Sequence, residues 1–215
     1  MLLLAVDTAT PAVTAALHDG TSVVAESSQV DARRHGELLL PAVDRVLDEA
    51  GVKLDAVTGI VVGVGPGPYT GLRVGLVTAA TFGSVLGVPV HGLCTLDALA
   101  YASGIEGPFF VATDARRKEV YWARYEDSRT RVGEAAVDRP ADVETGGLPV
   151  VGAGGVLYPE AFPDARGPEH VSAGALAALA AERLAAGADF LPVTPLYLRR
   201  PDAQVPKNYK VVTPK

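Results

Sequence analysis

The stretch Gly65–Gly75, which reads GPGPYTGLRVG, follows the apolar run Ile60–Val64 and opens a long apolar segment. β-favouring residues, then alternating glycine and proline, then a hydroxyl residue predict a strand, a tight loop and a helix. Thr70 is the expected N-cap, because its side-chain oxygen can accept a hydrogen bond from a free amide of the first turn. The stretch therefore predicts a strand–loop–helix unit of an α/β fold.

A glycine-rich loop between a strand and a helix often binds phosphate, because the loop amides and the helix N-terminus both favour an anion. This loop lacks the Gly-Lys-Ser/Thr ending of a P-loop, and Thr70 occupies the position of the third glycine of a dinucleotide fingerprint. Its two prolines also remove amides that would have to contact the phosphate. We interpret it as a loop motif rather than a nucleotide site, composed of Gly65, Pro66, Gly67, Thr70 and Arg73.

Small residues recur at every fourth position of the helix predicted at 71–86, which places them in one stripe. Glycine inside a helix costs roughly 1 kcal/mol relative to alanine, so the repeated glycines indicate that something packs very close. Spacing alone leaves two alternatives: the chain's own sheet, which it favours, or a helix of another chain. The stripe consists of Gly71, Gly75, Ala79, Gly83 and Gly87.

The composition is that of a globular protein, with 215 residues, of which 48% are hydrophobic and 20% are charged. The net charge of −6 argues against a protein that binds nucleic acid alone through a basic face. Cys94 is the only cysteine, which excludes an internal disulfide and a cysteine zinc cluster. Asp7 interrupts the N-terminal apolar run, and no clean membrane span follows. We therefore expect a cytoplasmic protein without membrane contact.

The apolar pattern predicts three strands at 2–6, 13–18 and 22–27, then a helix from about 37 to 50. Strands at 60–64 and 88–91 then alternate with helices at 71–86 and 95–102. A second half starts near Pro108, with strands at 109–113, 119–125 and 150–151 and a helix at 173–186. From Thr194 the pattern favours a solvated basic tail over a contact with RNA or an acidic partner; its cations are Arg199, Arg200, Lys207, Lys210 and Lys215.

Asp7 and Asp114 each end a predicted strand, one in each half of the chain. Such a pair can hold hydrated magnesium and phosphates between two lobes, or each aspartate can simply cap its own turn. A phosphate-binding hairpin after the second aspartate would need glycine, but Arg116 and Arg117 follow it and can pair with Asp114. We therefore expect a closed site. No metal site is predicted either, because no zinc pattern includes any of the four histidines, His18, His35, His91 and His170.

Five segments together resemble the TsaB (YeaZ) family, and the match runs over nearly the full length. They are LAVDT at 4–8, RHGELLLP at 34–41, GPGPYTGLRVG at 65–75, DARRKEVY at 114–121 and PLYLR at 195–199. The family usually has Ser-Phe in place of Pro68-Tyr69 and Ser in place of Gly36. Pro68 stiffens the loop, and neither change would break the fold.

The resemblance implies two actin-like (ASKHA, ribonuclease H-like) lobes, each a mixed sheet flanked by helices, at residues 1–104 and 105–215. It implies a role in making threonylcarbamoyladenosine (t6A) at position 37 of ANN-decoding tRNAs. In that family TsaD is the transferase and TsaB its non-catalytic companion, while TsaE is an ATPase that joins the complex. Asp7, Thr8, Asp114, Arg116 and Arg117 would then be vestigial phosphate-type positions.

The same resemblance implies that this chain binds no cofactor alone, that ATP and metal bind to the partner proteins, and that tRNA is reached only through the complex. A homodimer in the absence of TsaD is left open. It also favours the partner alternative for the glycine stripe, with contacts from the helices at 37–50 and 71–86. The expected interface residues are Leu38, Leu39, Pro41, Gly71, Leu72, Gly75, Ala79 and Gly83.

Two alternatives of other classes remain. A metallopeptidase of the glycoprotease type would need a paired-histidine ligand set, which the sequence lacks. An actin-like small-molecule kinase would need glycines in place of Arg116 and Arg117.

Overall fold

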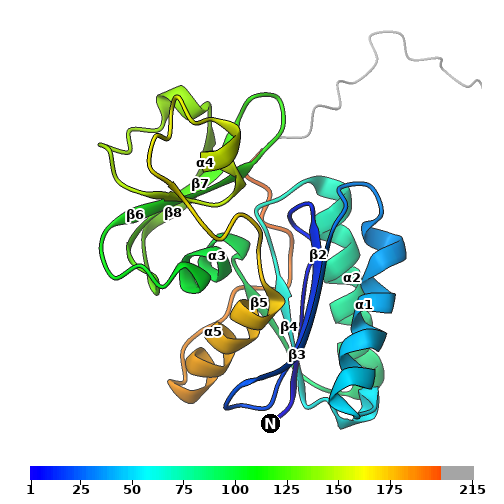
Figure 1. The fold of residues 1–215 in the computed structure, drawn as a ribbon. Helices are drawn as coiled ribbons and strands as arrows, with labels where there is room; N and C mark the ends of the chain where they lie inside the picture. The colour runs from blue at the N-terminus through cyan, green and yellow to red at the C-terminus, as the bar shows by residue number, and fades with distance from the viewer. Residues whose placement is uncertain (200–215) are drawn as a thin grey trace, which may run out of the picture.

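The computed structural model describes residues 1–199, which form two lobes, each built on one five-stranded sheet (Figure 1). The predicted basic-tail residues Arg200, Lys207, Lys210 and Lys215 lie outside the described residues.

The first sheet has the order β3-β2-β1-β4-β5. β1 to β3 form an antiparallel meander, and β4 and β5 are parallel to β1. Every residue of β1 and β4 is buried, because these strands lie in the middle of the sheet with helices on both faces. The elements of this lobe are β1 (Leu3–Asp7), β2 (Ala12–His18), β3 (Val23–Val30), α1 (His35–Ala50), η1 (Leu54–Ala56), β4 (Gly59–Gly63), α2 (Tyr69–Leu86), β5 (Val90–Leu93) and α3 (Thr95–Ser103).

The second sheet repeats this arrangement with the order β10-β9-β6-β7-β8. Its first strand again lies in the centre, with two antiparallel strands on one side and two parallel strands on the other. The shared topology confirms the predicted two-lobed actin-like fold. The elements are β6 (Phe109–Asp114), β7 (Val120–Asp127), β8 (Thr130–Asp138), η2 (Pro140–Asp142), β9 (Val150–Val151), α4 (Ala153–Leu157) and β10 (Ala165–Arg166).

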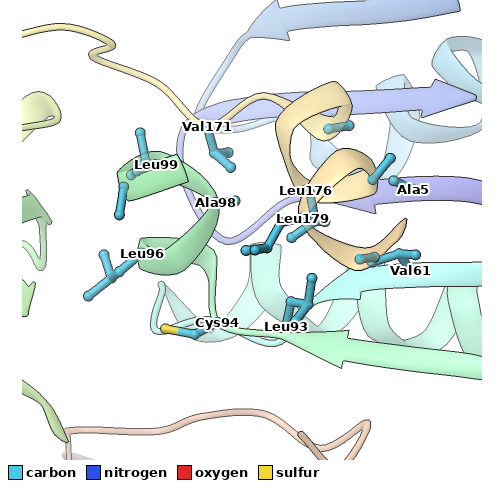
Figure 2. Close-up of a cluster of buried hydrophobic side chains, with 14 of the residues drawn as sticks. Ala5, Val61, Leu93, Cys94, Leu96, Ala98, Leu99, Val171, Leu176 and Leu179 are labelled. Atoms are coloured by element: carbon cyan, nitrogen blue, oxygen red, sulfur yellow. The ribbon is translucent and has the colours of Figure 1, made fainter. Parts of the chain in front are cut away.

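The helix α5 (Ala173–Ala185) returns to the first lobe and covers the face of the first sheet opposite α1 and α2 (Figure 1). Its start is fixed by the Ala173 amide, which donates to Thr14 Oγ1 at 3.1 Å, and by the Gly174 amide, which donates to Glu26 Oε1 at 3.1 Å. Leu176 and Leu179 of α5 belong to one buried cluster with Ala5 and Val61 of the sheet (Figure 2).

The segment after α5 also lies on the first lobe. The Leu191 amide donates to Gly92 O at 3.0 Å, and the Leu196 amide donates to Val64 O at 2.8 Å. The prediction that residues 105–215 form the second lobe is therefore wrong for α5 and this segment, although the break after residue 104 does separate the two sheets. The reason is that the alanine-rich helix needs a large apolar surface, and the first sheet still has one face uncovered.

Most predicted elements are found within a few residues of their expected bounds. The sequence pattern missed β8, where apolar residues do not alternate cleanly and most side chains are exposed or half-buried, and the short α4. The N-cap prediction for Thr70 is wrong. The helix starts at Tyr69 after Pro68, whose carbonyl accepts from the Leu72 amide at 3.1 Å, and no side chain caps it.

Candidate functional site

Asp7 lies at the end of β1 and is completely buried. Its Oδ1 accepts from the Ala9 amide at 2.7 Å, and its Oδ2 accepts from Thr95 Oγ1 at 2.7 Å. Burial raises the pKa of Asp7 from 3.8 to about 6, although these two hydrogen bonds oppose the shift. Both carboxylate oxygens are therefore engaged by the chain itself.

The loop motif packs directly against this aspartate and the turn that follows it. A side chain at Gly63 would overlap Asp7 Oδ2, and one at Gly67 would overlap the carbonyl of Ala9. Gly65 has a φ of +100°, which favours glycine. Gly65, Pro66 and Gly67 are all buried, so the glycines here provide room for the chain's own backbone rather than for an anion. Thr70 and Arg73 of the motif are exposed.

Thr8 attaches the start of α2 to the end of β1. Its Oγ1 donates to Gly71 O at 2.7 Å and accepts from the Gly75 amide at 2.9 Å. A Cβ on Gly71 would lie 2.6 Å from Thr8 O, and one on Gly75 would lie 2.7 Å from Thr8 Oγ1. A Cβ on Gly83 would overlap Val90 of β5. The small-residue stripe therefore faces the first sheet.

This orientation overturns the prediction that the stripe forms a partner interface. Gly71, Leu72, Gly75, Ala79 and Gly83 are all buried within the chain, because the backbone of α2 approaches the sheet closely along their side. On α1, Leu38 and Leu39 are also buried, whereas Pro41 is exposed.

The outward surface of the two helices has other apolar side chains. Val77 and Val85 of α2 are 64% and 76% exposed, and Leu40 of α1 is 50% exposed. The sequence offered a signal for the valines: they are eight positions apart and so share a face of the helix, away from the glycines. Of the three consecutive leucines at 38–40, the first two are buried and Leu40 is left exposed. α1 and α2 lie side by side on one face of the sheet (Figure 1).

In the second lobe, Asp114 ends β6 and its side chain is held by the turn that follows. Asp114 Oδ1 accepts from the Arg116 amide at 2.7 Å, and Arg116 Nη1 lies 3.2 Å from Asp114 Oδ2. The expected pairing is thus confirmed for Arg116. Arg199 also contacts this turn, with hydrogen bonds to Arg116 O and Glu119. Arg116, Arg117 and Lys118 all have positive φ, between 55° and 62°.

One cavity between the turn after β1 and the end of β6 is very small. It lies between Thr10 and Asp114, with a volume of about 10 Å³, which is space for about one water molecule. Thr113 Oγ1, beside it, is buried and has no hydrogen-bond partner among residues 1–199. Small-molecule sites usually occupy 300–1,000 Å³. Within residues 1–199, no three His, Cys, Asp or Glu side chains are grouped so that they could hold a metal ion. Burial raises the pKa of the Cys94 thiol to about 12, which keeps it protonated.

A family model described as "TsaD: tRNA N6-adenosine threonylcarbamoyltransferase" matches residues 23–187 of this chain. Two solved structures from Pseudomonas aeruginosa are similar along nearly their whole length. One is an uncharacterized protein with similarity to peptidase YeaZ (32% identity, TM-score 0.81, 92% of this chain and 99% of that one). The other is YeaZ itself (30% identity, TM-score 0.78, 92% and 100%).

The chain belongs to the TsaB (YeaZ) family.

Curated relatives agree with this assignment. An uncharacterized protein of Mycobacterium tuberculosis is 46% identical over 94% of this chain and 93% of its own length. The tRNA threonylcarbamoyladenosine biosynthesis protein TsaB of Escherichia coli is 35% identical over 59% of this chain, and the chain spans 55% of its length. The TsaB of Bacillus subtilis is 33% identical with similar coverage, 59% and 56%. Among the described residues, no helix is both long and apolar enough to cross a membrane.

Proposed function

We propose that this chain acts in t6A biosynthesis as the non-catalytic companion of a TsaD-like transferase. The observation that carries the proposal is the full-length similarity to YeaZ, together with relatives named for tRNA threonylcarbamoyladenosine biosynthesis. The target is adenosine 37 of ANN-decoding tRNAs, and the complex is cytoplasmic.

The internal pairing of both strand-end aspartates supports a non-catalytic role. Asp7 is bonded to Thr95 and Ala9, Asp114 is bonded to Arg116, and the small cavity beside Asp114 has space for about one water molecule. A nucleotide with its metal would have to displace these internal partners. ATP and metal therefore bind to the TsaD-like protein and to a TsaE-like ATPase, and this chain binds no cofactor alone.

The partner docks on the outward surface of α1 and α2, which we call the α1/α2 face and define by Leu40, Val77 and Val85. Exposed large apolar side chains on neighbouring helices are typical of a protein interface. Without the TsaD-like protein, the same face can pair two copies of this chain. The buried glycine stripe contributes to this interface only indirectly. It holds α2 close to the sheet and so determines how far the outward side chains of α2 project from the lobe.

The test is co-purification of this chain with the organism's TsaD-like protein, followed by a tRNA modification assay with and without this chain. Modification should require both proteins. Val77→Asp should abolish co-purification, because it places a charge in an apolar interface, while leaving the melting temperature unchanged. Val156→Asp is the matched control, since Val156 is 57% exposed but lies on α4 of the second lobe. The proposed docking on the α1/α2 face would be contradicted if Val77→Asp still co-purified normally. It would also be contradicted if Val156→Asp lost co-purification.

The peptidase and kinase alternatives have no support from a specific feature of the described residues. Purified chain should turn over neither ATP nor a peptide substrate. Turnover by the pure protein above that of a heat-inactivated sample would contradict the non-catalytic role.

A further inference from the structure

A pocket of about 330 Å³ opens where the two lobes meet, between the N-terminal ends of α1 and α2 and the turn after β6. Arg33 and His35 line it from the first lobe, and Arg116 lines it from the second. Among the described residues that line it there is no Asp or Glu, although the whole chain has a net charge of −6. The pocket is thus a basic site on an acidic protein.

The two arginines that line the pocket differ in whether a carboxylate neutralises their charge. Arg33 forms no ion pair within residues 1–199, whereas Arg116 shares Asp114 at 3.2 Å. His35 Nε2 lies 2.8 Å from Thr10 O, so this nitrogen carries the proton and donates to the carbonyl. At least one full positive charge therefore remains available for an anion.

A stack of exposed aromatic rings borders the pocket. Tyr69, which lines the pocket, stacks on Tyr197 with ring centroids 5.3 Å apart, and the two residues are 53% and 42% exposed. Arg73 lies 4.0 Å from the centre of the Tyr69 ring, and its Nε donates to Tyr197 Oη at 3.1 Å. Arg73 has no carboxylate partner among residues 1–199. The result is a flat, cationic, partly exposed surface, and no buried core requires it.

We propose that this basic mouth, defined by Arg33, Tyr69, Arg73, Arg116 and Tyr197, holds a short single-stranded stretch of the tRNA that the complex modifies. Single-stranded RNA offers phosphates at regular spacing and bases that stack on aromatic rings or on arginine planes. Separate cations on each side of a stacking surface match that alternation, whereas a lone small anion would use only one of them. Because the rest of the chain is acidic, a polyanion would approach it at this mouth. The proposal rests on the proposed function, which supplies tRNA as the nucleic acid.

The test uses the complex of this chain with its TsaD-like partner and a fluorescently labelled ANN-decoding tRNA, with affinity measured by anisotropy at several salt concentrations. The double variant Arg33→Gln/Arg73→Gln should bind tRNA about tenfold more weakly. The slope of log affinity against log salt should fall by about 1.4, because roughly 0.7 is lost for each phosphate contact to a single strand. Lys53→Gln/Arg124→Gln is the matched control, since both residues are exposed and neither forms an ion pair within residues 1–199.

Tyr69→Leu gives a second, independent measurement. It should weaken tRNA binding about tenfold but leave the salt slope unchanged, because stacking involves no counterion release. The melting temperatures of all variants should remain close to that of the parent.

Three results would overturn the inference. Unchanged tRNA affinity of the double variant would show that the mouth does not contact RNA. Loss of the TsaD-like partner would assign the mouth to the protein interface. Loss of ATP or ADP binding with unchanged tRNA binding would assign it to a free nucleotide. If the parent chain fails to form the complex or to support modification, the proposed function fails instead, so the two failures are distinguishable.

Discussion

Single residues at the end of β1 control how α2 sits on the sheet. Thr8 bonds both the carbonyl of Gly71 and the amide of Gly75 through one hydroxyl. This contact requires the helix backbone to approach the strand with no side chain between them. It therefore explains why Gly71 and Gly75 occupy these positions although glycine lowers the stability of a helix.

Gly75→Leu should lower the melting temperature. The new Cβ would lie 2.7 Å from Thr8 Oγ1, so the substitution overpacks the interface of helix and sheet, at a typical cost of about 1–3 kcal/mol. Thermal unfolding of the variant measures the effect. Gly36→Leu is the control, because an added Cβ at Gly36 meets nothing within 4 Å. A Gly75→Leu protein as stable as its parent would mean that the stripe is not packed inward.

Asp7 makes a pH-dependent contribution to stability. Its pKa is raised from 3.8 to about 6, so the native protein holds this proton more tightly than the unfolded chain does. The free energy of unfolding therefore falls as pH rises through this window, by about 3 kcal/mol from this group alone. Asp7→Asn should abolish that fall, because the amide carries no charge and its oxygen can still accept from Ala9.

Melting temperatures of parent and Asp7→Asn between about pH 4 and pH 8 provide the measurement. The difference should grow in favour of the variant as pH rises. Asp19→Asn is a control of opposite sign, since backbone hydrogen bonds from Ser22 and Thr21 lower the pKa of Asp19. An Asp7→Asn curve parallel to that of the parent would rule out titration of a buried carboxyl at this position.

At the scale of elements, the hairpin turn between β6 and β7 has an unfavourable backbone conformation at three consecutive residues. Arg116, Arg117 and Lys118 all adopt a left-handed conformation that costs a non-glycine residue roughly 1–2 kcal/mol. The turn is held in place by the Asp114–Arg116 pair and by Arg199. The chain therefore maintains backbone strain in this turn.

Lys118→Gly should melt at a higher temperature than Lys118→Ala. Both variants remove the same exposed charged side chain, but only glycine adopts a φ of 62° without steric cost. Thermal unfolding of the pair isolates the backbone effect. Equal melting temperatures would show that this turn stores no strain at Lys118.

At the scale of the whole molecule, one apolar cluster joins the lobes. It includes residues of the first sheet, α3 and α5, and also Phe109 and Tyr125 of the second sheet, whose rings stack 5.3 Å apart (Figure 2 shows its first-lobe part). Asp97 of α3 lies at the edge of this cluster. It accepts from Tyr125 Oη at 2.8 Å and from Arg131 Nη1 at 3.0 Å, and Arg183 of α5 lies 3.6 Å away. Burial and the Asp97 charge raise the pKa of Tyr125 well above its usual value.

Asp97→Ala should destabilise the protein by about 3–5 kcal/mol, because it leaves Arg131 half-buried without its carboxylate. Hydrogen exchange should increase in α3, β7 and α5 together, since all three meet at this residue. Glu182→Gln is the control: it weakens the exposed contact of Arg129 with α5, a type of pair typically worth no more than about 1 kcal/mol. If the increase in hydrogen exchange in Asp97→Ala were confined to α3, Asp97 would not link the lobes.

Hydrophobic periodicity and turn chemistry are local properties, so the features that depend on them could be predicted from the sequence. The positions of most strands and helices, their order in two similar halves, and the pairing of Asp114 with Arg116 all follow from residues close together in the chain.

The neighbour that each surface contacts could not be predicted in this way, because it depends on how the whole chain packs. A stripe of small residues fits any close neighbour, so its spacing could not distinguish a partner helix from the strand that carries Thr8. The alanine-rich α5 likewise has no local signal that assigns it to the first sheet. The basic mouth combines Arg33, Tyr69 and Arg116 from three distant parts of the chain. The negative net charge of the whole chain gave no sign of this local cluster of positive charge. Such long-range arrangements depend on how all the elements fill one core, which no local pattern contains.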